Sequence, residues 1–394
     1  MARYPAYAPD WSLRVNGEEL PAAVRGTVTS IRYEDGQNAA DRVEVGLANP
    51  DLRWLAKHIK GLGFQPFPTG IRIGPVKAGD LAPEGTFDIA NSLRLSLGYA
   101  PDPLEEVFQG EVTGVQVSFP NGGMPTLTMV AHDHLQRLAQ GSASRGFGPL
   151  QDALVVGILS AENLLIPQLD PAIVAVSAAM TAINIIFKGS GTKQKGQSDL
   201  QLLEKIAREY DADFWVDGNT LYLSRFVKEY EPRLTLTWGE SLLDFSPKMS
   251  TVGQVAAVSI KFTLREIPLD FLVTVFWDFD RESLGISIVP GAAAKGAKLV
   301  SGPTYTIIDE PVSSPADLAS SALKIYRELR NKLNNRLTGS GSAIGDPRIR
   351  AGAVIRLEGL GPDFSGNYRV ASATHSLDGG GYKTSFEVKK EILP

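Results

Sequence analysis

The sequence has no cysteine, which excludes disulfide bonds, thiolate metal sites, iron–sulfur clusters and cysteine nucleophiles. Histidine is scarce as well, with four residues in 394. There is no surplus of positive charge, because the formal net charge is −5. Dedicated nucleic-acid-binding proteins normally carry a basic surplus, so the composition argues against that class. The composition remains compatible with a protein wall past which nucleic acid slides, because such a wall should not bind phosphates tightly.

Long apolar segments are also missing. The N-terminus, Met1–Pro5, lacks the apolar core of a signal peptide. The most apolar run, Ala172–Phe187, is shorter than the about 20 residues that a membrane-spanning helix needs. We therefore expect this run to be buried core, and we expect a soluble protein without stable membrane insertion.

What is present is the composition of a globular protein, with 43% hydrophobic and 21% charged residues. A chain of 394 residues is too long for one typical domain and predicts two or three. The high content of glycine (39) and proline (25) favours turns and short strands over long helices. We therefore expect a β-rich α+β fold.

The first region contains strand and hairpin signals. Val24–Tyr33 and Arg42–Leu47 have the composition of strands. The run Val112–Phe119 leads into the turn Pro120–Gly123, and Thr126–Ala131 leads out of it. An Asn-Gly turn between two such runs predicts a β-hairpin.

The middle region is mixed. Residues 150–163 have a helical pattern, and Ser198 with Gln201 forms a capping box that begins a second helix. Two short β-rich runs on either side of Asp217–Thr220 predict another hairpin.

The last region returns to β structure. Val255–Thr263 and Phe271–Phe276 are strand-like, and the chain is β again from Gly352 onward. Between them, a helix is predicted over about 315–338, after a possible N-cap at Ser314. The composition of Gly339–Ser342 indicates a flexible linker.

The first and last regions share a pattern, which indicates an internal duplication. Each has a Gly-led strand, a Phe-x-Gly, a Gly-Gly turn and a strand that begins with threonine soon after the turn. The matched segments are Gly70–Gly74 with Gly352–Leu357, Phe108–Gly110 with Phe364–Gly366, and Gly122–Met129 with Gly380–Phe386. Two similar units per chain, in a trimer, would present six similar units around one axis.

The C-terminal stretch resembles the late-control D family of phage tail proteins. The residues that carry this resemblance are Gly345–Gly352, Phe364–Val370, His375 and Gly381–Phe386, with a weaker match over Gly196–Tyr210 and Gly218–Tyr222. That family includes the baseplate hubs of contractile phages, such as T4-like tail hubs. It also includes the head region of the valine-glycine-repeat spike proteins of type VI secretion.

This resemblance implies a β-rich α+β fold with two tail-tube-like β-barrel domains and a mixed α/β insert domain. The expected domains are 1–139 for the first barrel, 140–231 for the insert, and 232–394 for the second barrel with its inserted helix. The implied function is a structural baseplate hub. It would be a homotrimeric symmetry adaptor that joins a hexameric tail tube to a trimeric spike and lines the central channel.

The implied partners are two further copies of the chain, the tail tube or a distal tail protein, a spike protein and other baseplate (wedge) proteins. DNA would only pass through the channel. Because the sequence ends at Pro394, just after its last predicted strand, we expect the spike to be a separate polypeptide. The expected location is the tail baseplate of the virion, assembled in the cytoplasm of the host bacterium.

The sequence contains few candidates for chemistry. His132 and His134 flank Asp133, and an H-x-H on a strand can bind zinc, but a structural role for Asp133 at a strand end is favoured. Glu105 and Glu106 are adjacent, whereas glycosidase carboxylates come from separate elements, so solvated surface is expected. We therefore predict no enzyme, with no catalytic, metal-binding or cofactor-binding residues.

One candidate contact surface is the basic face of the helix predicted over about 315–338. It includes Lys324, Arg327, Arg330 and Arg336, which could bind an acidic neighbour or could simply be a solvated face. Two alternative functions stay open. One is the equivalent hub of a non-phage contractile injection system, and the other is a peptidoglycan-degrading baseplate enzyme.

Overall fold

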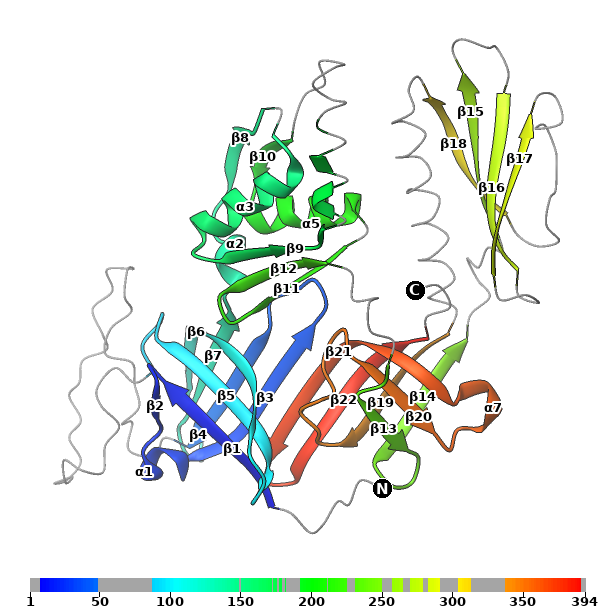
Figure 1. The fold of residues 1–394 in the computed structure, drawn as a ribbon. Helices are drawn as coiled ribbons and strands as arrows, with labels where there is room; N and C mark the ends of the chain where they lie inside the picture. Colours follow the sequence, from blue (N-terminus) through cyan, green and yellow to red (C-terminus); the bar gives the residue numbers. More distant parts are fainter. Residues whose placement is uncertain are drawn as a thin grey trace.

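The computed structural model describes residues 8–48, 87–148, 150–181 with gaps, 192–210, 212–224, 231–249, four strands between 257 and 312, and 337–390. Figure 1 shows a β-rich α+β protein with one large sheet, a smaller α/β unit and a separate small sheet. Most of the helix predicted over about 315–338, with its four basic residues, lies outside the described residues, and its last two positions, 337–338, begin a β-strand instead.

The large sheet has 13 strands and is built from two halves. The first half comprises β1 (Ala8–Val15), β2 (Glu18–Glu19), β3 (Val28–Gly36), β4 (Arg42–Ala48), β5 (Ser92–Ala100), β6 (Glu105–Ser118) and β7 (Thr126–Asp133). The second half comprises β13 (Leu234–Thr237), β14 (Leu242–Met249), β19 (Leu337–Ile344), β20 (Val354–Glu358), β21 (Gly366–Asp378) and β22 (Gly381–Lys389). Two short helices accompany them, α1 (Ala22–Arg25) and α7 (Gly361–Phe364).

The two halves repeat one strand order. The first runs β3-β4-β7-β6-β5-β1, and the second runs β14-β19-β22-β21-β20-β13. The outermost strands differ in direction, because β1 is antiparallel to β5 while β13 is parallel to β20. A duplication is therefore visible in the topology, with β3 equivalent to β14 and β6 equivalent to β21.

The irregularities of the two halves repeat as well. The β6–β7 ladder shifts register between Val112 and Gly114, and the β21–β22 ladder shifts between Val370 and Ser372. The β3–β4 ladder shifts after Val28, and the β14–β19 ladder shifts after Leu242. Because bulges alter twist locally, bulges at matching positions place the following residues equivalently in the two halves.

This topology corrects two expectations about the duplication. Phe108 lies within β6, whereas Phe364 lies in α7 ahead of β21, so the two Phe-x-Gly segments are not equivalent. The strand that corresponds to β20 is β5, and Gly70–Gly74 lies outside the described residues.

The large sheet does not form two closed barrels. Among the described strands, the hydrogen-bonded path ends at β14 on one side and at β1 and β2 on the other. The two halves are joined because β21 of the second half pairs with β3 of the first. The expected β-rich α+β fold is confirmed, but the expected tube-like barrels are not closed among the described strands, because their two halves form one continuous open sheet.

Alternation of apolar and polar residues explains why these strands bury one face. In β4, Val43, Val45 and Leu47 are buried while the residues between them are partly exposed. Strand β7 has the same alternation. The buried side chains form three hydrophobic clusters, one in each half and one in the α/β unit.

The α/β unit lies between the two halves in sequence. It contains α2 (Gln136–Ala139), β8 (Ala143–Gly146), α3 (Asp152–Glu162), β9 (Ile166–Leu169), β10 (Lys193–Gln197), α5 (Asp199–Glu209), β11 (Asp213–Asp217) and β12 (Thr220–Ser224). Strands β11, β12 and β9 form a mixed sheet, and β10 pairs with β8. None of the described helices combines the length and apolar character that crossing a bilayer requires.

Several local predictions are confirmed in these elements. Ser198 Oγ accepts a hydrogen bond from the backbone N–H of Gln201, and the Gln201 side chain accepts one from Ser198, which completes the capping box. The predicted hairpins are β6–β7 and β11–β12. Their turns contain Gly122 and Gly218, both with positive φ, which glycine adopts at little cost.

Three predicted segments differ in the structure. The strand expected from Val24 begins only at Val28, because α1 occupies Ala22–Arg25. The strands predicted near 255 and 271 are confirmed as β15 (Ala257–Leu264) and β16 (Asp270–Asp278), but they lie in a separate four-stranded sheet with β17 (Ser283–Pro290) and β18 (Thr304–Val312).

The third difference is the expected linker Gly339–Ser342, which lies in β19, between β14 and β22. A Cβ at Gly339 would approach the Phe245 ring to 2.5 Å, and one at Gly341 would approach the Asp244 carbonyl oxygen to 2.7 Å. These glycines therefore permit close packing rather than flexibility.

Candidate functional site

The two halves of the sheet meet along β3 and β21, and we call this contact the joint. Residues 372–378 of β21 pair antiparallel with residues 30–36 of β3. Leu377 and Tyr382, both from the second half, pack into the hydrophobic cluster of the first half. The joint therefore combines a backbone ladder, where β21 lies beside β3 (Figure 1), with a shared core.

Arg350 connects the second half to a buried carboxylate of the first. Its Nε donates a hydrogen bond of 3.2 Å to Asp35 Oδ2, and its Nη2 donates one of 2.8 Å to the Tyr33 hydroxyl. The backbone N–H of Ala351 donates to the same Asp35 oxygen at 3.0 Å. Because Asp35 is only 7% exposed, its charge depends on these donors for compensation.

Two further carboxyl groups lie beside this contact. The Tyr33 hydroxyl donates a hydrogen bond of 2.8 Å to Asp41 Oδ2. The backbone N–H of Asp133 donates to the Asp41 carbonyl oxygen at 3.1 Å, and Asp133 Oδ1 accepts a hydrogen bond from the Leu135 N–H at 3.0 Å. We call Tyr33, Asp35, Asp41, Asp133 and Arg350 the acidic cluster of the joint.

Two carboxyl groups of the acidic cluster, Asp41 and Asp133, bind protons more tightly than isolated carboxyl groups do. Burial raises the pKa of Asp41 well above the usual carboxyl value, and the negative charges of Asp35 and Asp133 raise it further. Burial raises the pKa of Asp133 to about 7. Part of this carboxyl pair therefore stays protonated near neutral pH, which reduces repulsion between the buried carboxyl groups.

His375 forms the other side of the joint and is fully buried. Its ring stacks on Tyr33 with centroids 5.5 Å apart. Nε2 lies 3.0 Å from the Ile349 carbonyl oxygen, which can only accept, so this nitrogen carries the hydrogen. Nδ1 then accepts a hydrogen bond from the Tyr382 hydroxyl at 2.8 Å. Burial lowers the pKa of His375 to about 4, so the imidazole is neutral at physiological pH.

Three of these hydrogen bonds cross between the halves, because Arg350 donates to Asp35 and Tyr33 and the Ala351 N–H donates to Asp35. These bonds would be lost if the halves separated, so the arrangement suits a rigid connection between two parts of a chain. Sequence reasoning did not single out Tyr33, Asp35 or Asp41. The available signal was Arg350, within the Gly345–Gly352 motif that carries the family resemblance.

The structure separates the two histidines that could have formed a metal site. His132 Nδ1 lies 2.7 Å from Thr113 Oγ1, and His134 Nδ1 lies 2.7 Å from the Gly218 carbonyl oxygen. Strand β7 ends at Asp133, so His134 lies outside it. In the part of the chain that is described, no group of three or more histidine, aspartate or glutamate residues is placed to hold a metal ion.

The remaining predicted candidates lie on the surface or outside the described residues. Glu105 and Glu106 are exposed on β6, as expected, and Glu106 Oε2 lies 3.8 Å from Arg94 Nη1. The basic helix face of Lys324, Arg327, Arg330 and Arg336 lies outside the described residues.

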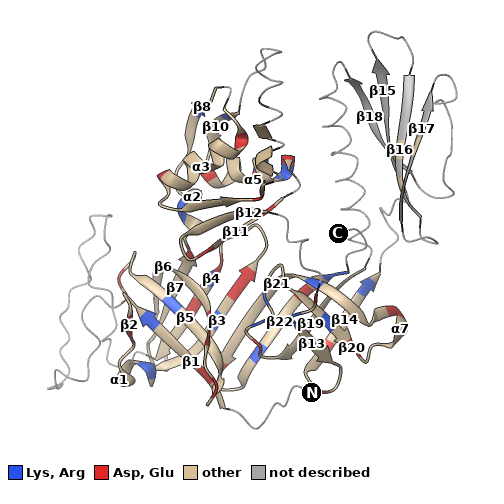
Figure 2. Cartoon of the chain, in the orientation of Figure 1, with Lys and Arg blue, Asp and Glu red and all other residues tan. Residues whose placement is uncertain are grey.

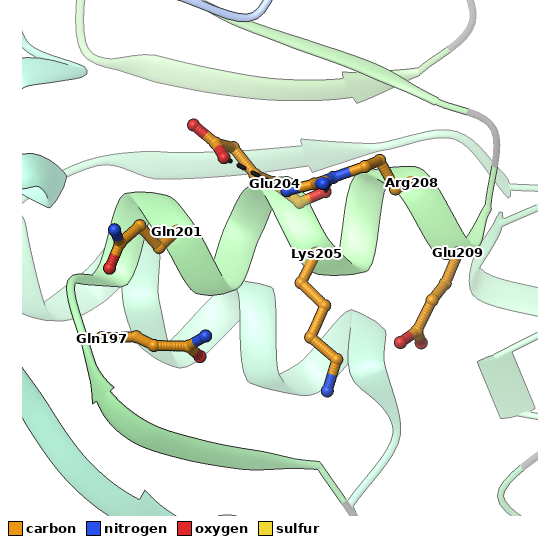
Figure 3. Close-up of a pocket in the computed structure, with 6 residues that line it drawn as sticks. All are labelled: Gln197, Gln201, Glu204, Lys205, Arg208 and Glu209. Atoms are coloured by element: carbon orange, nitrogen blue, oxygen red, sulfur yellow. Dashed lines mark hydrogen bonds and ion pairs between the residues drawn. The ribbon is translucent and has the colours of Figure 1, made fainter.

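One hollow of about 410 Å³ lies along the outer face of α5. Figure 3 shows its lining side chains, which project from this helix and from the residue before its N-cap. They are Gln197, Gln201, Glu204, Lys205, Arg208 and Glu209. Charges of both signs lie there, and Arg208 Nη2 pairs with Glu204 Oε2 at 3.4 Å. This pattern is typical of a solvated helix face.

The fold resembles solved structures of tail proteins. A 43 kDa tail protein of prophage MuSo2 from Shewanella oneidensis matches with a TM-score of 0.59 at 13% identity, over 97% of this chain and 98% of that one. A tail protein from Neisseria meningitidis matches with a TM-score of 0.56 at 13% identity, over 98% and 97% of the two chains.

A third similar structure comes from a secretion machine. It is an E. coli component of the type VI secretion system that is itself similar in structure to the T4 bacteriophage tail proteins gp27 and gp5. The TM-score is 0.53 at 11% identity, over 97% of this chain and 80% of that one. No family model matches the sequence, and no curated protein matches it. The resemblance to tail proteins expected from the sequence is confirmed at the level of fold.

Proposed function

We propose that the chain is a structural hub of a phage-type tail baseplate. It acts as a homotrimeric symmetry adaptor between a hexameric tail tube and a trimeric spike, and it lines the central channel. The observation that carries this proposal is the repeated strand order of the two halves, with bulges at matching positions. Two similar halves in each of three chains provide six similar binding surfaces for a six-fold partner.

The likeness in fold supports this proposal over nearly the whole chain. The two tail proteins and the type VI secretion component described above each cover at least 97% of it. Their common setting is a tail or tail-like injection machine, and we extend that setting to this chain.

The division into domains is part of the proposal. We propose a first tube-like unit over 1–139, an insert over 140–231 and a second tube-like unit over 232–394. The three hydrophobic clusters support a division into three units, although Leu135 and Leu138 pack in the cluster of the insert. In the assembled ring, the two halves of the large sheet lie next to each other and form neighbouring binding surfaces for the tube.

The open face of the sheet suits a channel wall. At the joint, Arg32 pairs with Glu34 at 2.7 Å, and Arg42 pairs with Glu34 and Glu44. Figure 2 shows basic and acidic residues interspersed over these strands. Positive charges that are already paired with carboxylates attract phosphates weakly, so DNA or a protein cargo could pass without being held.

The proposal is tested by the mass of the full chain in solution. Light scattering should give three times the chain mass of 42.4 kDa. Electron microscopy of the protein mixed with its tail-tube protein should then show rings stacked on tube ends. Monomers that neither assemble alone nor bind tube ends would contradict the hub.

We propose a contact surface on the predicted helix, whose residues from about 315 to 336 lie outside the described part of the chain. Lys324, Arg327, Arg330 and Arg336 would face an acidic partner such as the tube or spike. Reversing Arg327 and Arg330 to glutamate should weaken binding to that partner while the unfolding transition stays unchanged. Normal assembly of this variant would contradict the proposed contact.

An alternative function is the equivalent hub of a non-phage contractile injection system. The similarity in fold to the type VI secretion component favours it. The two machines differ in their cargo, which is DNA in a phage and a protein effector in a secretion system. Purification of the assembled particle would distinguish them, because only a phage tail is attached to a capsid filled with DNA.

A further inference from the structure

Among the described strands, β14 and the end of β6 each leave one backbone edge of the large sheet without a partner strand. Strand β14 pairs with β19 on one side, and no described strand pairs with its other side. On β6, residues 105–111 pair with β5, and Val112 exchanges backbone hydrogen bonds of 2.8 and 2.9 Å with Ala90 and Asn91. Beyond Val112, no described strand pairs with residues 113–118 on the side away from β7.

The equivalent part of β21 shows what such an edge binds. Val370 exchanges backbone hydrogen bonds with Gly352 and Ala353, both of 2.9 Å, as Val112 does with its neighbours. The register shift that follows Val370 also matches the one that follows Val112. Residues 372–376 of β21 therefore correspond to residues 114–118 of β6, and in β21 they pair with β3.

The free edge of β14 corresponds to the partner strand in that pair. Both β3 and β14 skip one residue against their neighbouring strands, after Val28 and after Leu242 respectively. On this alignment Tyr33 corresponds to Pro247, and Asp35 corresponds to Met249. The edge of β3 that pairs with β21 is thus the equivalent of the edge that β14 leaves open.

We propose that β14 of one copy pairs antiparallel with residues 115–119 of the next copy, which are the end of β6 and the first residue of the turn after it. This pairing would repeat, between two chains, the joint that exists within one chain. The inference rests on the trimeric hub proposed above, and it names the contact between its subunits. The register follows from the β3–β21 pairs. The expected pairs are Val115 with Met249, Gln116 with Lys248, Val117 with Pro247, Ser118 with Ser246 and Phe119 with Phe245.

Exposed apolar side chains mark both edges. Phe119 and Met124, beside the end of β6, are 65% and 66% exposed, and Leu243 and Met249 on β14 are 46% and 52% exposed. On the alignment Phe119 corresponds to Leu377, which packs into the hydrophobic cluster of the other half at the joint. Pairing between copies would bury Phe119 in the same way.

The free segment of β6 also lacks the usual protection of an edge strand. Residues 113–118 contain no charged side chain, although charges and proline normally prevent edges from pairing. On β14, Pro247 lacks an N–H and therefore removes at most one hydrogen bond from the ladder. Because the contact joins two different edges, it is head-to-tail, and such contacts close into a ring when the rotation allows it.

Cysteine cross-linking tests this register directly, because the chain contains no cysteine. Two double variants of the full chain, Val115→Cys with Met249→Cys and Gln116→Cys with Lys248→Cys, place cysteines at adjacent pairs. Opposed residues in an antiparallel ladder have Cβ atoms about 4.5–5.5 Å apart, and adjacent pairs alternate in spacing. At least one variant should form disulfides between chains under mild oxidation, and the cross-linked series should end at the trimer.

A control variant, Val115→Cys with Ser246→Cys, places the cysteines three residues out of register and should cross-link at least about tenfold less, because disulfides need a close Cβ approach. Equal cross-linking of the control, or a series that extends beyond the trimer, would contradict the paired ring. Light scattering separates the two proposals. A trimer without cross-links overturns the edge pairing alone, whereas a monomer overturns the trimeric hub and this contact with it.

A second pair of variants tests the apolar contact. Phe119→Asp should weaken trimer formation by at least about tenfold, because the interface would bury an unpaired carboxylate. Ile166→Asp is the matched control, since Ile166 is 64% exposed but lies in the insert, away from both edges. If both variants assemble as the parent does, the β6–β14 contact is wrong.

Discussion

Arg350 Nε donates a hydrogen bond of 3.2 Å to Asp35 Oδ2, although 315 positions separate these residues in the sequence. The contact crosses from one half of the large sheet to the other. It lies beside the β3–β21 ladder and the His375–Tyr33 stack, so three kinds of interaction hold the joint at one place. The duplicated halves are thereby fixed next to each other within one chain.

Removing this guanidinium should destabilise the fold. We expect Arg350→Ala to lower the free energy of unfolding by about 2–3 kcal/mol, because the buried Asp35 carboxylate loses its charged partner. Arg356→Ala is the control, since the Arg356–Glu358 pair is exposed and should be worth less than about 1 kcal/mol. Urea denaturation of both variants measures the difference. Equal losses would show that the joint does not depend on the charge of Arg350.

Asp133 should make stability fall as the pH rises. Its pKa is about 7 in the folded protein, against about 3.9 in the unfolded chain. Between these values the folded state keeps a proton that the unfolded state has released, so stability is present at low pH and is lost through pH 7. Asp133→Asn can still accept the Leu135 N–H and lacks this titration. The free energy of unfolding of the parent should therefore drop more steeply than that of the variant over this window, and parallel curves would contradict the prediction.

His375 should act in the opposite direction. Its pKa is lowered to about 4, whereas an unfolded histidine titrates near about 6.5. The unfolded state therefore binds a proton first as the pH falls, and stability that is present above about pH 6.5 is lost towards pH 4. Nitrogen NMR of labelled histidines should show a neutral ring with hydrogen on Nε2 down to about pH 5. The signal is assigned by its loss in His375→Gln, and protonation near pH 6.5 would refute a buried neutral imidazole.

Two glycine substitutions should have opposite effects. Gly341→Ala should cost about 1–3 kcal/mol, because the new Cβ would lie 2.7 Å from the Asp244 carbonyl oxygen and 3.1 Å from Phe245. Gly157→Ala, in the middle of α3, meets nothing within 4 Å and should stabilise the protein by about 0.5–1 kcal/mol. Thermal unfolding of both variants checks the signs. A neutral Gly341→Ala would mean that β14 and β19 can move apart without loss.

The local elements that the sequence predicted depend on residues close together in the chain. The capping box of Ser198 and Gln201 and the hairpin around Gly122 are examples, because a cap or a tight turn needs only its own few side chains. The family resemblance, carried by the Gly345–Gly352 motif and its neighbours, also predicted the β-rich α+β class but not the open sheet that joins the two halves. The same local reasoning failed at Gly339–Ser342, since its composition indicates a linker while Phe245, from a distant strand, requires glycine there.

The sequence by itself determined the β-rich character, the main turns, the capped helix and the presence of two related halves. Only the tertiary structure decided which strands correspond, where the halves join and which polar residues are buried there. The physical reason is that strand alternation defines a buried face but not a partner. Pairing β21 with β3, and Arg350 with Asp35, depends on contacts between segments more than 300 residues apart.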